Sequence, residues 1–146
     1  MRRDRILIKT TIEDSGFETL CQKASEALEN AYCPYSKYRV GAAILAESGK
    51  IYSGCNIENA SYGVSNCGER TALFKAVSEG ERKFSAIAIF TDPGNQPPFP
   101  CGVCRQALSE FCSPDMPVIV FDGERSVYNL TLGELLPYSF EFDPNK

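Results

Sequence analysis

The sequence has no histidine among its 146 residues. This absence excludes the Ser-His-Asp triad, the Cys-His dyad and every zinc site that uses an imidazole ligand. Any transition-metal site in this chain must therefore be built from cysteine, aspartate or glutamate side chains.

Long hydrophobic runs are also lacking. No segment approaches the roughly 20 apolar residues that span a bilayer, and the first nine residues are too polar for a secretory signal. The net charge is −4 and the positive residues are scattered, which disfavours a nucleic acid partner. We therefore expect a cytoplasmic protein that binds neither nucleic acid nor a membrane.

A framework of disulfides is not expected either. The seven cysteines are odd in number and unevenly spaced, which fits a reducing compartment better than an oxidising one. Free cysteine behaves as a small hydrophobe and is often buried. On that basis we interpret four of the seven as core residues: Cys21, Cys33, Cys55 and Cys112.

The chain contains no repeat or long linker, so residues 1–146 are expected to form one domain. Periodicity and turn signals predict nine elements in the order α-β-β-α-β-α-β-β-α. They are a helix capped by Asp14 or Ser15, strands Val40–Glu47 and Lys50–Asn56, helix Cys67–Glu79, strand Phe84–Phe90, helix Cys101–Phe111, two strands around Asp122 and Gly123, and a short helix within 131–137. This order predicts an α/β fold of three layers, α/β/α, with a central mixed sheet of about five strands.

The segment "PCGVC" carries the strongest chemical signal. Cys101 and Cys104 have the Cys-x-x-Cys spacing that places two thiolates on one metal ion. Cys67 is the best candidate for a third ligand, because it also stands in the first turn of a predicted helix. A helix N-terminus favours thiolate over thiol, so two such termini would converge on one Zn²⁺. A thioredoxin-like redox pair is the competing interpretation of Cys101 and Cys104.

Charge decides how such a site would work. Three thiolates and Zn²⁺ sum to −1, and Arg70 and Arg105, each beside a candidate ligand, could offset that charge. An open fourth position would make the site catalytic, since zinc lowers the pKa of water to about 7. A fourth cysteine, Cys55 or Cys112, would make the site structural and the protein a non-catalytic zinc-stabilised binding module.

Glu69 stands two residues after Cys67, where a carboxylate could shuttle the proton of an activated water. The simpler interpretation is structural. Asn66 and Glu69 have the spacing of a capping box, in which Glu69 would only cap its own helix. The sequence leaves both interpretations open at this position.

A string of motifs in this chain resembles the small homotetrameric zinc-dependent cytidine deaminases of pyrimidine salvage. The motifs are "PYSKYRVGAAI", "GCNIENASY", "CGE" followed by "RTALFKAVSEG", "FPCGVCRQ" and "GELLPYSF". A ligand-x-Glu segment followed by Pro-Cys-x-x-Cys is the signature of zinc nucleobase deaminases. The resemblance implies hydrolytic deamination of cytidine and deoxycytidine, with water activated by zinc attacking C4 and Glu69 moving the proton.

The resemblance also implies roles in substrate binding. Asn56 and Glu58 would bind the ribose 3′-hydroxyl, and Tyr38 stands where the family has a phenylalanine that stacks on the base. Gly68 replaces the family's usual alanine, whose N–H meets the pyrimidine carbonyl. Phe140 would complete the pocket of a neighbouring subunit, unless the tail folds onto its own core.

Two alternatives remain within this fold. One is the deamination of another nucleoside-like compound, such as a nucleoside antibiotic, although the ribose-binding pair argues against it. The other is editing of a polynucleotide, which the acidic balance of the chain disfavours.

Overall fold

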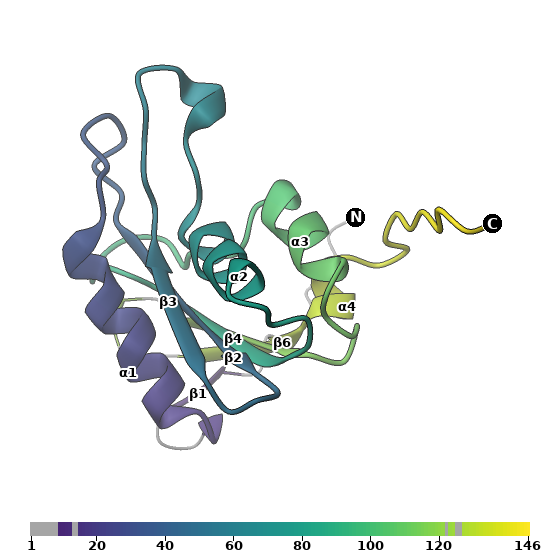
Figure 1. Cartoon of the computed structure of the whole chain (residues 1–146). Coiled ribbons are helices and arrows are strands. Elements are labelled where there is room, and N and C mark those ends of the chain that lie inside the picture. Colours follow the sequence, from purple (N-terminus) through teal and green to yellow (C-terminus); the bar gives the residue numbers. More distant parts are fainter. Residues whose placement is uncertain (1–8, 13–14, 122, 125–126) are drawn as a thin grey trace, which may run out of the picture.

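The computed structural model describes residues 9–12, 15–121, 123–124 and 127–146, and a single mixed sheet runs through it (Figure 1). Its strand order is β1-β6-β5-β4-β2-β3, with β4 and β5 parallel and the other neighbours antiparallel. The strands are β1 (Lys9–Thr10), β2 (Val40–Ala46), β3 (Ile51–Cys55), β4 (Phe84–Thr91), β5 (Pro117–Phe121) and β6 (Val127–Thr131). The predicted mixed sheet is confirmed, and β1 adds a short edge strand that the sequence analysis did not anticipate.

Helices cover both faces of the sheet, as the predicted three-layer α/β/α fold requires. They are α1 (Glu18–Ala27), α2 (Gly68–Ser78), α3 (Gly102–Ser109) and α4 (Leu132–Leu135), with short 3₁₀ turns η2 (Leu28–Asn30) and η3 (Tyr62–Val64). Helix α1 packs on one face, and α2, α3 and α4 pack on the other (Figure 1). Over the described ranges, no helix combines the length and the apolar character needed to cross a bilayer.

Side chains of the central strands point alternately to the two faces of the sheet, and each face has its own hydrophobic core. In β4, Ile87 and Ile89 belong to the core beneath α2 and α3, whereas Ala86 and Ala88 belong to the core beneath α1. Successive side chains of a strand point to opposite faces, so one apolar run supplies both cores. The small side chains on the α1 face leave room for that helix to lie close to the sheet.

Two glycines let the helices approach the hairpin of β2 and β3. A Cβ atom added at Gly41 would lie 2.2 Å from the Ala24 carbonyl oxygen of α1, and one added at Gly54 would lie 2.5 Å from the Ala72 nitrogen of α2. Only glycine allows backbones to come this close. Gly54 therefore fixes the distance between α2 and the sheet, and with it the position of the helix that carries Glu69.

The predicted start of the first helix is wrong. Helix α1 begins at Glu18, because Gly16 has a φ of +77°, a left-handed conformation that a right-handed helix cannot include. The Ser15 hydroxyl donates to the Ile12 carbonyl oxygen and accepts from the Phe17 N–H, so it stabilises a turn before the helix. Asp14 lies outside the described residues.

Candidate metal centre and adjoining cleft

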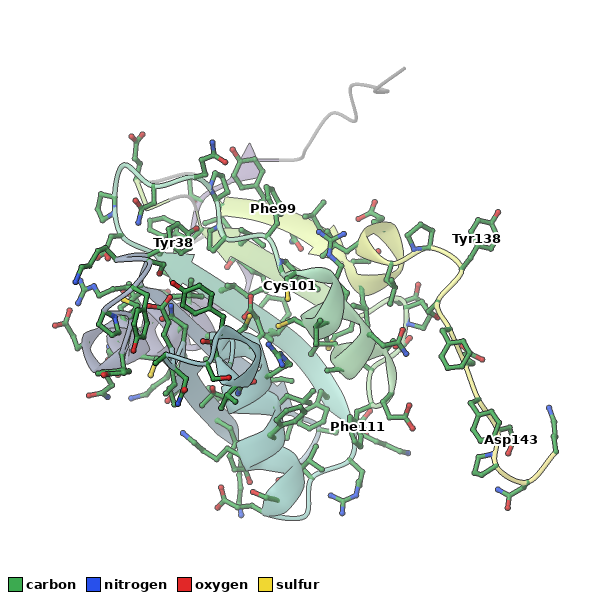
Figure 2. All side chains as sticks on the ribbon, turned by 90° about the horizontal axis from the view of Figure 1, so that it is seen from above. Tyr38, Phe99, Cys101, Phe111, Tyr138 and Asp143 are labelled. Atoms are coloured by element: carbon green, nitrogen blue, oxygen red, sulfur yellow. The ribbon has the colours of Figure 1, made fainter. Side chains whose placement is uncertain are left out.

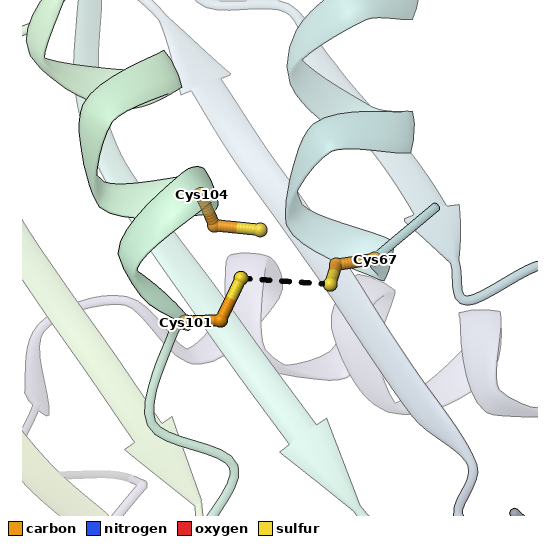
Figure 3. A group of neighbouring side chains, drawn as sticks. All are labelled: Cys67, Cys101 and Cys104. Carbon is orange, nitrogen blue, oxygen red and sulfur yellow. Dashed lines mark hydrogen bonds between the residues drawn. The ribbon is translucent and has the colours of Figure 1, made fainter. Parts of the chain in front are cut away.

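Two helix N-termini bring three thiols together (Figure 3). Cys67 is the N-cap residue of α2, Cys101 is the N-cap residue of α3, and Cys104 lies in the first turn of α3. The three Sγ atoms lie within 4.8 Å of one another, and those of Cys67 and Cys101 are 3.8 Å apart. The structure thus brings together the three cysteines that sequence analysis grouped, and a redox pair made of Cys101 and Cys104 alone does not describe this cluster.

The donor set fits zinc. Thiolates at about 2.3 Å from a tetrahedral ion are separated by about 3.8 Å, the distance found between the Cys67 and Cys101 sulfurs. Soft sulfur ligands in this arrangement select zinc over hard cations. Of the seven cysteines, all of which are free and described, only these three form a cluster, so neither Cys55 nor Cys112 supplies a fourth ligand.

Hydrogen bonds within the cluster favour a thiolate at Cys67. A bond from the Cys104 thiol, with further contributions from Arg70 and Cys101, lowers the pKa of Cys67 to about 5. The pKa of Cys104 is raised, because its proton is held by Cys67 and because its side chain is buried. The two thiols therefore titrate as a pair.

Arg70 brings a positive charge into contact with the cluster. Its Nη2 donates to the Cys67 Sγ at 3.5 Å, and its Nε is buried without a hydrogen-bond partner among the described residues. For Arg105, the described residues show no such bond to a thiol. Its guanidinium instead donates to the carbonyl oxygens of Pro100, at 2.7 Å, and Leu135, at 2.6 Å, and so ties α3 to α4.

Glu69 lies buried beside the thiols, with only 4% of its surface exposed. Removal from water raises the pKa of its carboxyl group to about 7, because burial disfavours the charged form. The Cys104 Sγ lies 3.7 Å from Glu69 Oε2. A carboxyl group in this environment is suited to accept and to donate a proton near neutral pH.

The capping interpretation of Glu69 is wrong. Helix α2 has Cys67 at its N-cap position and no side-chain capping bond, so Glu69 is one position too early for a capping box. The amide of Asn66 donates to the Thr71 hydroxyl instead. Glu69 is therefore buried for a reason other than helix capping.

A cleft of about 510 Å³ opens beside the thiols and Glu69. It contains five of the residues for which sequence analysis expected a catalytic or binding role, together with two of the three thiols. The lining residues are Ser36, Tyr38, Val40, Asn56, Glu58, Cys67, Gly68, Glu69, Gln96, Pro97, Pro98, Phe99 and Cys101.

Asn56 and Glu58 are oriented by the backbone. The Asn56 Oδ1 accepts from the Val40 N–H at 2.9 Å and its Nδ2 donates to the Tyr38 carbonyl oxygen at 2.7 Å. The Glu58 Oε1 accepts from the N–H groups of Tyr35, at 3.0 Å, and Ser36, at 3.1 Å. The hydrogen bonds from Ser36, then that from Tyr35, lower the pKa of Glu58 and keep it charged. Each side chain retains capacity for a ligand, one N–H on Asn56 and Oε2 on Glu58.

Tyr38 and Gly68 lie in the cleft wall. The Tyr38 hydroxyl, which the family's phenylalanine would lack, donates to the Gln96 carbonyl oxygen at 2.7 Å. Gly68 is buried in the first turn of α2, and a Cβ added there would lie 3.1 Å from the Val40 carbonyl oxygen. An alanine at this position would therefore require a shift of a few tenths of an ångström.

Phe140 lies outside this cleft. It is 72% exposed on a tail that leaves α4 and projects from the body, with Tyr138 and Phe142 also exposed (Figure 2). The Phe140 carbonyl oxygen accepts from the Gln106 side chain at 3.1 Å. The alternative in which the Phe140 ring packs onto its own core is wrong.

Sequence analysis missed one complete wall of the cleft. Gln96, Pro97, Pro98 and Phe99 come from a segment that could be recognised only as irregular. Its position directly before Cys101 was the available signal, since residues next to a metal ligand necessarily lie near the metal.

Known proteins are similar to this chain in sequence and in fold. A family model described as "Cytidine and deoxycytidylate deaminase zinc-binding region" matches residues 15–120. A protein of Sporosarcina psychrophila named cytidine deaminase is 50% identical over 123 residues, which cover 84% of this chain and 90% of that protein. The crystal structure of cytidine deaminase from Burkholderia pseudomallei is similar with a TM-score of 0.79 and 44% identity, covering 84% of this chain and 98% of that chain. A blasticidin-S deaminase of Bacillus cereus is 30% identical over 128 residues, covering 83% of this chain and 89% of that protein.

Proposed function

The chain belongs to the cytidine and deoxycytidylate deaminase family, and we propose that it converts cytidine and deoxycytidine to uridine and deoxyuridine by hydrolysis, with release of ammonia. This reaction belongs to pyrimidine salvage. One observation carries the proposal: a buried carboxyl group, Glu69, lies next to three converging thiols at the side of an open cleft. A cytoplasmic location is part of the proposal, in keeping with seven free cysteines.

Cys67, Cys101 and Cys104 would hold the zinc ion. When bound, zinc supplies Lewis-acid chemistry that lowers the pKa of water to about 7. Arg70 offsets the excess negative charge of three thiolates through its contact with the Cys67 Sγ. Without that charge, three thiolates would weaken the acidity of the ion.

Glu69 moves the protons. Its carboxylate accepts one proton from the attacking water and donates it to N3 of the pyrimidine. It then accepts the second proton, from the hydroxyl group formed at C4, and donates it to the amino group, which leaves as ammonia. Burial makes this possible, because a carboxyl group held away from water binds a proton more tightly than an exposed one. The same residue thus acts first as general base and then as general acid.

The substrate occupies the cleft beside Glu69. Asn56 and Glu58 bind the ribose 3′-hydroxyl with the donor and the acceptor that their backbone contacts leave available. The Tyr38 ring lies against the base and the Gly68 N–H meets the pyrimidine carbonyl.

Phe140 completes the cleft of a neighbouring subunit in a homotetramer. Its 72% exposure on a projecting tail supports this role, since a large aromatic side chain left in water costs hydrophobic free energy. Light scattering tests the tetramer. If the mass is that of a monomer, Phe140 has no neighbouring subunit whose cleft it could complete, and its proposed role is refuted.

The cleft favours a nucleoside over a nucleotide. Within the described part of the chain its lining includes no lysine or arginine, but it includes Glu58 and Glu69. A phosphomonoester would bring two negative charges toward these carboxylates without a cation to pair them. We expect zinc-loaded protein to convert cytidine, followed by loss of its ultraviolet absorbance, with a kcat/KM about 100-fold above that for deoxycytidylate. Absence of turnover with cytidine would refute the proposed function, and equal rates would refute the nucleoside preference.

A second candidate substrate is a nucleoside antibiotic. The relative that supports it is the blasticidin-S deaminase, although its identity to this chain is lower than that of the cytidine deaminases. The same assay with blasticidin S beside cytidine distinguishes the two. The pair formed by Asn56 and Glu58 supports cytidine, because an intact ribose gives both side chains a ligand.

A non-catalytic zinc module would need a closed coordination sphere. We expect the X-ray absorption spectrum of the zinc-loaded protein to show three sulfur ligands and one lighter ligand, because Cys55 and Cys112 lie outside the thiol cluster. Matched Cys55→Ser and Cys112→Ser variants should keep one zinc per chain. Four sulfur ligands would instead support the closed module.

A further inference from the structure

The segment 92–99, between β4 and Pro100, has no regular structure, and its second half, residues 96–99, forms one wall of the cleft. Its backbone makes two local bonds, from the Asn95 N–H to the Asp92 carbonyl oxygen and from the Phe99 N–H to that of Pro97. An irregular segment with so few internal bonds takes its position from contacts with the rest of the protein.

Two neighbouring residues before β2 provide several of those contacts, in addition to the bond from the Asn95 amide to the Thr91 hydroxyl and the packing of the Phe99 ring on Tyr128. Arg39 makes a bidentate ion pair with Asp92, with distances of 2.8 Å from Nε to Oδ2 and 2.7 Å from Nη2 to Oδ1. Tyr38 donates from its hydroxyl to the Gln96 carbonyl oxygen at 2.7 Å. Arg39 therefore holds the start of the segment, and Tyr38 holds the part that lines the cleft.

Tyr38 is also bonded to the other side of the cleft. Its carbonyl oxygen accepts from the Asn56 Nδ2 at 2.7 Å, and the Asn56 Oδ1 accepts from the Val40 N–H at 2.9 Å. One residue thus joins the backbone at Gln96 to the side chain of Asn56. The distance between these two walls depends on the two bonds that Tyr38 makes.

We propose that Tyr38 is a positioning residue, whose hydroxyl sets the width of the cleft by holding the backbone of Gln96. The inference rests on the proposed function, in which a nucleoside lies between these walls. Among the described residues the hydroxyl donates to Gln96 and makes no hydrogen bond to Glu69 or to the thiols, so it acts on the walls that hold the substrate throughout the reaction. An interaction that supports ground state and transition state equally changes KM and leaves kcat unchanged.

The test compares Tyr38→Phe with the wild-type protein and with Tyr52→Phe. Phenylalanine keeps the ring of Tyr38 and removes only the hydroxyl. Tyr52, on β3, is a matched control, because its hydroxyl donates to the Glu81 carboxylate at 3.2 Å and its side chain does not line the cleft. For Tyr38→Phe we expect a rise in KM for cytidine of about three- to tenfold, the effect of one neutral hydrogen bond, with kcat within about twofold and equal zinc content. Tyr52→Phe should leave KM unchanged.

A second measurement does not depend on activity. Hydrogen exchange, followed by mass spectrometry over residues 92–99, should be faster in Tyr38→Phe than in the wild type and unchanged in Tyr52→Phe. Unchanged exchange in Tyr38→Phe, or faster exchange with an unchanged KM, would overturn the positioning role. If zinc-loaded wild-type protein leaves cytidine intact, the proposed function fails, while the exchange comparison still decides whether Tyr38 holds the segment.

Discussion

Glu69→Gln is expected to reduce the turnover of cytidine by about 10⁴-fold while leaving zinc bound. The amide has the size and shape of the carboxyl group but cannot accept a proton from water or deliver one to N3. General acid-base help contributes about 10²- to 10⁴-fold, and the upper end is expected here because Glu69 serves in more than one proton transfer. The measurement is kcat/KM for cytidine beside zinc content on the same sample.

The matched control for this variant is Glu110→Gln, the same change of charge at an exposed position after α3. It should retain the activity of the wild type. Loss of zinc from Glu69→Gln would indicate that Glu69 is itself a zinc ligand. We do not expect this result, because the candidate metal cluster consists of the three thiols without Glu69. Turnover at the normal rate in that variant, with zinc retained, would remove Glu69 from the proton transfers.

Removal of zinc should have an effect of similar size. Dialysis against a strong chelator is expected to reduce deamination by more than about 10³-fold, because water without a Lewis acid has a pKa far above the working pH. The melting temperature should fall by several degrees, since a ligand that binds only the folded state stabilises it. Added Zn²⁺ should restore both quantities, whereas Mg²⁺, which prefers oxygen ligands, should restore neither.

A cysteine variant distinguishes the effect of losing zinc from any direct effect of the chelator on the protein. Cys101→Ser removes one soft ligand at an exposed position, so the protein should fold, lose zinc and lose activity. Cys33→Ser changes a half-buried cysteine outside the cluster and should keep both. Undiminished turnover by protein shown to be free of metal would contradict the proposed site.

The order of helices and strands could be predicted because local patterns specify it. The hairpin of β2 and β3 and the helices that start beside Cys67 and Cys101 all occur where periodicity and turn signals place them, within about two residues. Helix α1 was the exception. Gly16 adopts a left-handed conformation, and a sequence does not reveal which of its glycines will use that freedom.

Contacts between distant segments were harder to predict. Arg70 and Arg105 each stand next to a candidate zinc ligand in the sequence, yet only Arg70 bonds to a thiol. A side chain of this length can reach several groups, and the packing of α4 against α3 directs Arg105 toward the Leu135 carbonyl oxygen. Adjacency in the sequence could not distinguish the two arginines.

The sequence by itself determined which residues could carry the chemistry of this protein. Because there is no histidine, the candidate metal ligands had to be cysteines or carboxylates. The Cys-x-x-Cys pair and the Cys-x-Glu segment could be recognised because their spacing is a local property of the chain. Only the tertiary structure decided that Glu69 is buried beside the thiols instead of capping its helix, and that Tyr38 bonds to Gln96. Burial and the closeness of walls depend on how α2 and the segment 92–99 pack against the sheet. That packing depends on many weak contacts between residues far apart in the chain, so no short sequence motif predicts it.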